Sequence, residues 1–409
     1  MSSSSIPPSA WSPLLPAVFW LSVGVLAWVY LGYPLLVAVL ARVRPIGLRP
    51  TLPLPTVSVG IAVHDEADVI AERIADVFGQ EADGSIRLEE VIVASDGSTD
   101  GTEAVVAGLA ETEPRLRLLV LGRGGTTAAQ HAILESARSE VVVLTDAETR
   151  FARGCLAALT AVFRDSRVGC ATGRLEWQNL DATATARNEG LYWRYERLVR
   201  ALESRAGMLT AATGAILAVR RAAYRPVRST TGMDHLLPLY VIEGGGLVVY
   251  VREALATDRP ISGLREQYRN RLRTATRGIA ANLSMVGRLA PWRHPRAAVA
   301  IWSHKLLRWA TPWFVAAAAG SGLLLALGGE PLYGLAPIGL VGGLVAAALA
   351  HAISRTGRRP PRALAFVRSF LVVNLAFARA WWNVVLGRQI EAWHRAEFEV
   401  RVSGPQGRG

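Results

Sequence analysis

The sequence predicts an α/β domain with a mostly parallel sheet, flanked by transmembrane helices. Residues 17–40 are almost wholly apolar, which is about the length that a helix needs to cross a bilayer. Between residues 56 and 250, short apolar runs alternate with amphipathic stretches, as in a β-α-β series. Within that series, residues 139–150 read SEVVVLTDAETR, an apolar run that ends abruptly at the carboxylates Asp146 and Glu148.

The composition narrows the class of protein. Of the 409 residues, 51% are hydrophobic and the mean hydropathy is +0.26, which is too apolar for an ordinary soluble enzyme. The net charge is +12, and Lys305 is the only lysine. Because the arginines are spread or lie beside apolar segments, we expect membrane lipids and phosphate-bearing substrates rather than nucleic acid. The two cysteines, Cys155 and Cys170, give no sign of a disulfide framework, and we expect both to be reduced and buried.

The amino-terminal part contains the first predicted span. Residues 1–16 form a polar segment rich in Ser and Pro, and residues 17–41 form a predicted transmembrane helix. A signal peptide fits poorly, because no basic stretch precedes the apolar run and the run is too long. Arg42, Arg44 and Arg49 follow directly, which places them in the cytoplasm by the positive-inside rule.

Residues 56–260 form the predicted α/β domain. Its expected strands lie at 57–63, 90–94, 116–121 and up to 146, and its expected helices at 66–79, 99–109 and 126–138. Apolar tracts that could extend the sheet lie at 167–172, 215–219 and 247–251. This alternation favours a mostly parallel sheet with helices on both faces, and ligands of such sheets bind at the carboxyl ends of the strands.

Asp146 and Glu148 lie at such a strand end. In an extended stretch, side chains two residues apart point the same way, so the two carboxylates can converge on one divalent cation. The alternative is a solvated strand end followed by a helix start, since acidic residues favour both places.

The chain changes character after residue 260. Residues 261–300 form a basic region that we expect at the membrane interface, and further spans are predicted at 306–328 and 332–354. The loop between these spans carries only Glu330, as expected of an outside loop, and arginines follow the third span. The amino terminus is therefore expected outside and the α/β domain in the cytoplasm.

Residues 366–387 are hydrophobic, but Arg368, Asn374 and Arg379 interrupt them. A charge in the middle of a bilayer is costly, and the basic tail at 388–409 would prefer the cytoplasm. We expect an interfacial or re-entrant helix here, with a fourth transmembrane helix as the alternative.

Four short motifs follow one another within this frame. They are VASDGSTDGT at 93–102, DAE at 146–148, MDHLLP at 233–238 and QYRNRLR at 267–273. Their order and spacing resemble those of family 2 glycosyltransferases, which have the GT-A fold, and in particular their membrane-bound, polysaccharide-forming members. The resemblance covers roughly residues 33–393.

The resemblance implies an inverting glycosyltransferase that uses a nucleotide-activated sugar. It implies that Asp146 and Glu148 hold a divalent cation, Mg²⁺ or Mn²⁺, with the donor diphosphate, and that Asp234 is the catalytic base. It also implies substrate contacts from Asp65, Glu66, Asp96, Arg123, Asp146, Trp193, Arg271 and Arg273. Of these, Trp193 would stack on an acceptor sugar, and the two arginines of the last motif would contact phosphate.

Each of these roles has a simpler alternative. Asp234 precedes a helix-like segment and could be its N-cap. The arginines of the last motif could face anionic lipid headgroups. Trp193 could be a packing aromatic.

Among the departures from the family pattern, two put the activity in question. Gly125 stands where many members have a lysine, and Arg123 is the cation that can compensate. Met233 stands where the family has the first residue of its acidic pair, which leaves Asp234 alone. A catalytically inactive relative that binds a sugar nucleotide or a protein partner is therefore the alternative function.

By resemblance, the expected donor is a UDP-sugar, with GDP as the alternative nucleotide. The expected acceptor is a saccharide or a lipid-linked acceptor at the cytoplasmic face of the inner membrane, in the synthesis of a cell-surface polysaccharide or glycolipid. Three spans leave little room for a polymer channel, so export of a long product would need a partner or an oligomer.

Overall fold

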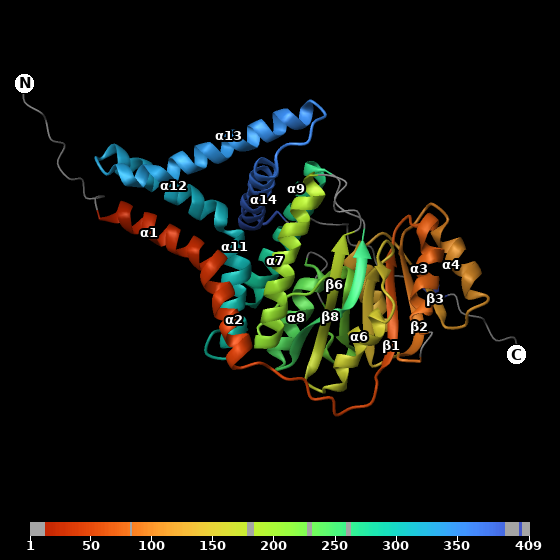
Figure 1. The fold of residues 1–409 in the computed structure, drawn as a ribbon. Helices are drawn as coiled ribbons and strands as arrows, with labels where there is room; N and C mark the ends of the chain where they lie inside the picture. Colours follow the sequence, from red (N-terminus) through yellow and green to blue (C-terminus); the bar gives the residue numbers. More distant parts are fainter. Residues whose placement is uncertain are drawn as a thin grey trace, which may run out of the picture.

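A mixed β-sheet forms the centre of the larger part of the molecule (Figure 1). The computed structural model describes residues 13–81, 84–177, 184–226, 231–258, 263–388 and 401–402, without the side chains of 184–193 and 401–402. The strands are β1 Thr56–Val63, β2 Arg87–Asp96, β3 Leu116–Leu121, β4 Val141–Asp146, β5 Arg150–Phe151, β6 Val168–Trp177, β7 Leu217–Arg220, β8 Leu247–Asp258 and β9 Arg401–Val402. Their order in the sheet is β5-β8-β6-β7-β4-β1-β2-β3-β9.

The prediction of a mostly parallel sheet needs correction, because the sheet is mixed. Strand β1 pairs in parallel with β2 and β4, and β2 with β3, as predicted. Strand β7, however, runs antiparallel to both β4 and β6. The turn before it, Gly214–Ile216, lies beside the carboxyl end of β4, where Thr145 Oγ1 donates to the carbonyl of Ala215 at 2.8 Å. A strand that enters the sheet at this edge must run back against β4.

Helices cover both faces of the sheet, as predicted. One face packs against α3 Ala67–Gly79, α4 Thr102–Ala110 and α6 Cys155–Ala161, and the other against α5 Thr126–Ser136, α8 Met233–Glu243 and α9 Leu264–Met285. Strand β4 alternates as a two-sided strand should: Val141 and Val143 belong to the first core, and Val142 and Leu144 to the second.

The close contact of α5 with the sheet depends on Gly60 of β1. A Cβ atom at this position would overlap the side chain of Ile133 on α5. A residue without a side chain is therefore required where this helix crosses the central strand.

Several helices are long and apolar enough to cross a membrane. They are Leu14–Val43 (α1 Leu14–Ala27, a π-helical turn and α2 Tyr33–Val43), Pro331–Arg355 (which contains α13 Leu335–Arg355) and α14 Arg362–Val385. A further pair, Pro295–Trp309 and Thr311–Leu327 (α12), qualifies only as one span bent by 61°. The predicted spans at 17–41 and 332–354 each fall within one of these helices. The predicted span at 306–328 contains the bend. Most of the interfacial or re-entrant helix expected at 366–387 lies within α14.

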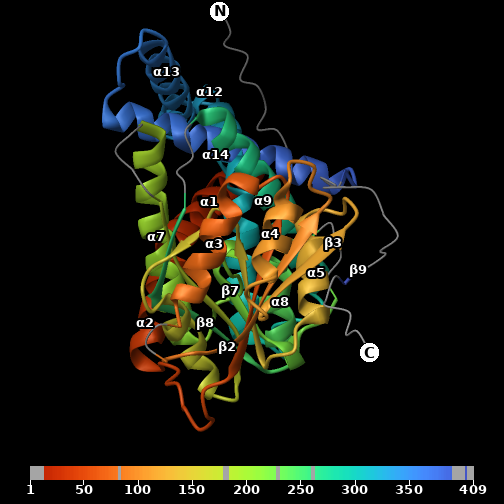
Figure 2. The same ribbon diagram turned by 90° about the vertical axis from the view of Figure 1, so that its right-hand side faces the viewer.

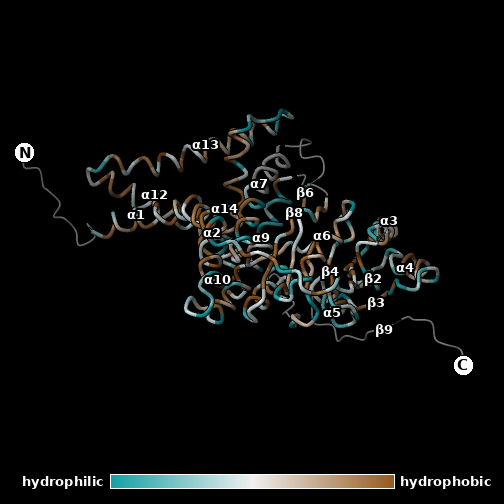
Figure 3. The backbone as a smooth tube through the Cα atoms, turned by 60° about the horizontal axis from the view of Figure 1, so that its bottom comes forward, coloured by the Kyte–Doolittle hydropathy of each residue, from teal (hydrophilic) through white to brown (hydrophobic). Residues whose placement is uncertain are grey.

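The apolar helices have two orientations. Helices α1, α12 and α13 extend together away from the sheet, whereas α14 runs crosswise to them (Figures 1 and 2). Helix α14 packs chiefly on the basic helix α9, and also on α13. The parts farthest from the sheet, in α1, α12 and α13, are also strongly hydrophobic (Figure 3). The arrangement places α14 between these three helices and the sheet domain.

Candidate active site

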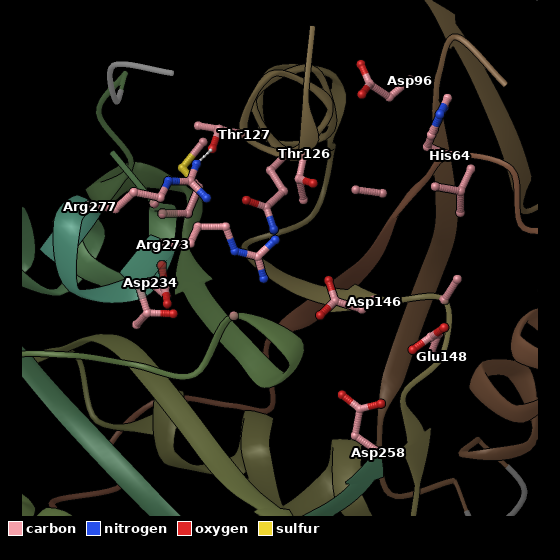
Figure 4. A pocket seen from close by; sticks show the side chains of 18 of the residues that line it. His64, Asp96, Thr126, Thr127, Asp146, Glu148, Asp234, Asp258, Arg273 and Arg277 are labelled. Carbon is pink, nitrogen blue, oxygen red and sulfur yellow. Dashed lines mark hydrogen bonds between the residues drawn. The ribbon is translucent and has the colours of Figure 1, made fainter. Parts of the chain in front are cut away.

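A cleft of about 390 Å³ lies at the carboxyl ends of β1, β2 and β4 (Figure 4). Parallel strands bring the side chains that follow them to one edge of the sheet, which is where ligands of such sheets bind. Six of the residues predicted from the sequence line this cleft: Glu66, Asp96, Asp146, Glu148, Asp234 and Arg273. The fold thus gathers residues that are far apart in the sequence.

Three carboxylates lie on one side of the cleft (Figure 4). Asp146 ends β4 and is half-buried, Glu148 follows it and is exposed, and Asp258 ends β8. Burial, together with the negative charges of Asp258 and Asp234, raises the pKa of Asp146 to about 6. Sequence reasoning missed Asp258, because it ended the last apolar tract at residue 251. The signal was the same as for Asp146: an acidic residue that closes a strand of the sheet.

The chemistry of this group fits a divalent cation. The raised pKa of Asp146 reflects its burial and, second, the nearby carboxylates of Asp258 and Asp234, and a bound cation would stabilise the ionised form against both. Mg²⁺ and Mn²⁺ prefer carboxylate oxygens, and Mg²⁺ usually takes one or two of them and completes its shell with water and phosphate. Among the described residues, no three His, Cys, Asp or Glu side chains are grouped as a complete metal site. Asp146 and Glu148 therefore fit a cation that shares its ligands with a bound phosphate.

Asp234 lies in the first turn of α8, across the cleft from these carboxylates (Figure 4). The helix begins at Met233 with Gly232 as its N-cap, and no side chain caps it. The simpler alternative, that Asp234 is the N-cap, is therefore wrong. Its carboxylate is stabilised in place by the positive end of the helix dipole and lines the cleft.

Asp96 organises the turn around Gly125, the position at which the sequence has no lysine. Its Oδ1 atom accepts hydrogen bonds from the backbone amides of Gly124 and Gly125 at 2.6 and 2.9 Å, and its Oδ2 atom accepts from Gly125 at 2.9 Å. Arg123 Nη1 lies 3.6 Å from Oδ2 of Asp96. Asp96 lines the cleft, whereas Arg123 is not among its lining residues. The arginine thus balances the charge of Asp96 from beside the cleft.

Asp65 has a supporting position. It adopts a left-handed backbone conformation with φ of 55°, and its Oδ1 atom accepts a hydrogen bond from the amide of Thr99 at 2.7 Å. The neighbouring Glu66 lines the cleft, but Asp65 does not. Asp65 therefore links the loop after β1 to the turn after β2 rather than facing the cleft.

The predicted basic segment divides between two cavities. Arg273 lines the first cleft with Arg277, whose Nη2 atom donates to Thr127 Oγ1 at 2.7 Å. Arg271 lines a second cavity of about 250 Å³. The two cavities share part of their lining: Asp146, Gly214, Asp234, His235, Asp258 and Thr274. The side chain of Trp193 lies outside the described residues.

The fold and this cleft define a GT-A-like α/β domain. A mannosyltransferase from Pyrobaculum calidifontis, solved with GDP-Man and Mn²⁺, has a similar fold: the TM-score is 0.64 at 23% identity, over 90% of this chain and 99% of that one. Residues 58–227 match the profile of "Glycosyl transferase family 2". The chain therefore carries a glycosyl transferase family 2 domain, which confirms the family predicted from its motifs.

Curated relatives match over shorter segments. An N-acetylglucosaminyltransferase of Neorhizobium galegae is 28% identical over 237 residues, or 53% of this chain and 54% of that protein. A beta-monoglucosyldiacylglycerol synthase of Nostoc sp. is 29% identical over 142 residues, or 34% of this chain and 30% of that protein. The chain thus spans about half the length of this N-acetylglucosaminyltransferase and of the one from Bradyrhizobium diazoefficiens.

Proposed function

We propose that this protein is an inverting glycosyltransferase that moves a sugar from a nucleotide-diphosphate sugar to a saccharide or lipid-linked acceptor at the cytoplasmic face of a membrane. One observation carries the proposal: a single cleft brings Asp146, Glu148 and Asp234 together with Arg273 and Arg277. The curated relatives, named for the transfer of N-acetylglucosamine and the synthesis of a glucosyl lipid, support the same class of reaction.

The donor diphosphate would lie between acidic and basic walls of the cleft. Asp146 and Glu148 would hold a divalent cation, which when bound neutralises the charge that develops on the departing diphosphate. Arg273 and Arg277 on α9 supply positive charge from the other side. The nucleoside would extend towards Glu66 and Asp96, which line the same cleft.

Asp234 is positioned to accept the proton of the acceptor. As the acceptor hydroxyl oxygen attacks the anomeric carbon, its proton passes to the Asp234 carboxylate and the bond from that carbon to the diphosphate oxygen breaks. Because Asp234 lines both cavities, the acceptor would approach it from the second cavity while the donor fills the first. One direct displacement inverts the anomeric configuration, and a product with retained configuration would contradict this mechanism.

The position of α14 favours an interfacial helix over a fourth crossing. Helices α1, α12 and α13 share a direction, and α14 runs across it (Figures 1 and 2). If the three helices cross the bilayer, α14 lies along the membrane surface, with Arg368 Nη1 donating to the carbonyl of Ala350 at 3.0 Å and to Ser354 Oγ at 2.6 Å on α13. The sheet domain then faces the cytoplasm, on the side of the basic segments.

The alternative, a catalytically inactive relative that binds a sugar nucleotide or a partner, depends on Gly125 and Met233. Met233 is 1% exposed, belongs to the core and lines the cleft, so Asp234 is the acidic side chain that α8 contributes there. Gly125 donates its amide to Asp96, while Arg273 and Arg277 supply cations to the cleft. These contacts favour the active enzyme.

The test is nucleotide release by the purified full-length protein across UDP- and GDP-sugars with Mn²⁺ or Mg²⁺. We expect metal-dependent release with one donor, reduced by about 10²- to 10⁴-fold in Asp234→Asn, as for loss of a general base. Donor binding should survive in that variant, because the proposal assigns the diphosphate to Asp146, Glu148, Arg273 and Arg277 rather than to Asp234. Donor binding without release in the wild type, with membrane lipids and acceptors present, would favour the inactive relative.

A further inference from the structure

The second cavity contains a concentration of positive charge away from the donor cleft. Beyond the six residues shared by the two cavities, its charged lining residues are Glu196, Arg200, Arg271, Lys305 and Arg308. The three carboxylates Asp146, Asp234 and Asp258 all belong to the shared part. The cavity is therefore acidic where it meets the donor cleft and basic at its other end.

Glu196 is the carboxylate of the basic end, and its oxygens are already bound. Its Oε1 atom accepts from Arg200 Nε at 3.1 Å, and its Oε2 atom accepts from Arg308 Nη1 at 2.7 Å. Burial alone would raise the pKa of Glu196, but the charges of His304, Arg308 and Lys305 hold it well below its usual range. One permanent negative charge thus faces Arg200, Arg308 and Lys305.

His304 connects this group to a second carboxylate, Glu203. Its Nδ1 atom lies 2.8 Å from Oε1 of Glu203, and its Nε2 atom lies 3.3 Å from Oε2 of Glu196 and 2.8 Å from Arg308 Nη1. Both carboxylates near the basic end are therefore already in contact with groups other than Lys305.

Lys305 is the cation whose hydrogen-bonding capacity is unused. Its ammonium is 3.8 Å from Oε1 of Glu196, which is beyond hydrogen-bond length. It makes no hydrogen bond within the described part of the chain, although the residue is only 7% exposed and lines the cavity. An ammonium has three donors, and burying it without hydrogen bonds is costly. Beside its ion pair with Glu196, the ammonium can therefore still donate hydrogen bonds to an anionic oxygen that enters the cavity.

We propose that the basic end of the second cavity binds an anionic oxygen group of the acceptor, a phosphate or a carboxylate, with Lys305 as its hydrogen-bonding partner. This inference rests on the proposed function, because it assigns the second cavity to the acceptor. The acidic end would repel the same group, so the charge difference orients the acceptor with its hydroxyl towards Asp234. Apolar side chains beside the basic end, including Trp309 and Phe377, accommodate the uncharged part of the acceptor.

The experiment measures the binding of matched neutral and anionic probes to the full-length protein, with the donor cleft filled by nucleoside diphosphate and Mn²⁺. One arm compares methyl glucoside with methyl glucuronide and methyl glucoside 6-phosphate, for an anion carried by the sugar. The other arm compares farnesol with farnesyl phosphate, for an anion carried by a lipid. We expect at least tenfold tighter binding of the anionic probe in one arm, and that arm identifies the source of the charge.

The variants assign this preference to Lys305. Lys305→Met keeps the length of the side chain and should remove the preference, whereas Lys305→Arg should keep most of it. Arg87→Met removes an equal charge from an exposed position at the amino end of β2, and we expect it to bind like the wild type. The inference is overturned if neither arm shows a preference, or if Lys305→Met retains it.

Nucleotide release separates this inference from the proposed function. Release with water as the acceptor depends on the first cleft, so Lys305→Met should keep it within about threefold of the wild type. Absence of release with every donor would contradict the proposed function, whatever the probes do. Release without any preference for the anionic probes would contradict this inference and leave the proposed function standing.

Discussion

Gly232 leaves the space that the carboxylate of Asp234 occupies. A Cβ atom at residue 232 would collide with Oδ1 of Asp234, two residues further along the chain. The collision would rotate the carboxylate away from its present position, because the backbone at the start of α8 is held by helical hydrogen bonds. The absence of a side chain at residue 232 is therefore a requirement for the position of the proposed base.

We expect Gly232→Ala to lower the kcat of nucleotide release by about 10- to 100-fold, since a small misplacement of a catalytic group has effects of this size. Donor affinity should change little. Gly108→Ala is the matched control, because Gly108 lies in α4 with no atom near its missing Cβ. If Gly232→Ala keeps the wild-type kcat, then either Asp234 is not the base or its carboxylate can move without loss of activity.

Asp146 is expected to destabilise the metal-free protein. Its pKa in the folded protein is about 6, against an ordinary value of 3.8, so deprotonation is less favourable in the folded state than in the unfolded chain. The stability that the protonated carboxyl gives is fully present below pH 3.8 and is lost as the pH rises through 6. At pH 7 to 8 we expect Asp146→Asn to raise the free energy of unfolding by about 1 to 3 kcal/mol.

The gain should appear in denaturant titrations with a chelator present, and Mn²⁺ should reduce it, because the cation stabilises only the wild-type carboxylate. Glu148→Gln is the comparison: its carboxylate is exposed, so we expect no gain in stability but weaker metal binding. Equal stability of wild type and Asp146→Asn without metal would contradict the cost of holding the buried Asp146 carboxylate in its ionised form.

The same pKa predicts the pH dependence of metal binding. A protonated carboxyl is a poor ligand, so protons compete with the cation as the pH falls below about 6. We expect the apparent dissociation constant of Mn²⁺ to be nearly constant above pH 7 and to rise by up to about tenfold per pH unit well below 6. Titrations followed by the electron paramagnetic resonance of free Mn²⁺ measure this, and a constant affinity between pH 5 and 8 would exclude Asp146 as a ligand.

The crosswise position of α14 predicts that Arg388, which follows this helix, lies on the cytoplasmic side of the membrane. We expect Glu330→Cys to react with an impermeant maleimide added outside intact cells, and Arg388→Cys to react only after permeabilisation. Background labelling should be low, because Cys155 and Cys170 are both buried. Labelling of Arg388→Cys from outside would instead establish α14 as a crossing helix.

The sequence alone predicted the strands β1 to β4, the helices between them and the carboxylate at the end of β4. This succeeded because a buried strand needs a continuous apolar run and its carboxyl end needs a polar turn, and both are local properties. The burial of Cys155 and Cys170, each 0% exposed, also followed from composition. The motifs around Asp96, Asp146 and Asp234 were sufficient to identify the family.

Only the tertiary structure decided which distant residues share a cavity. The reversed direction of β7 depends on where the chain re-enters the sheet, and Asp258 joins the cleft only because β8 pairs with β6. In the sequence, Lys305 is one cation among many. Its significance arises from a fold that buries it near Glu196 without a hydrogen bond, and the periodicity of either segment cannot encode that contact.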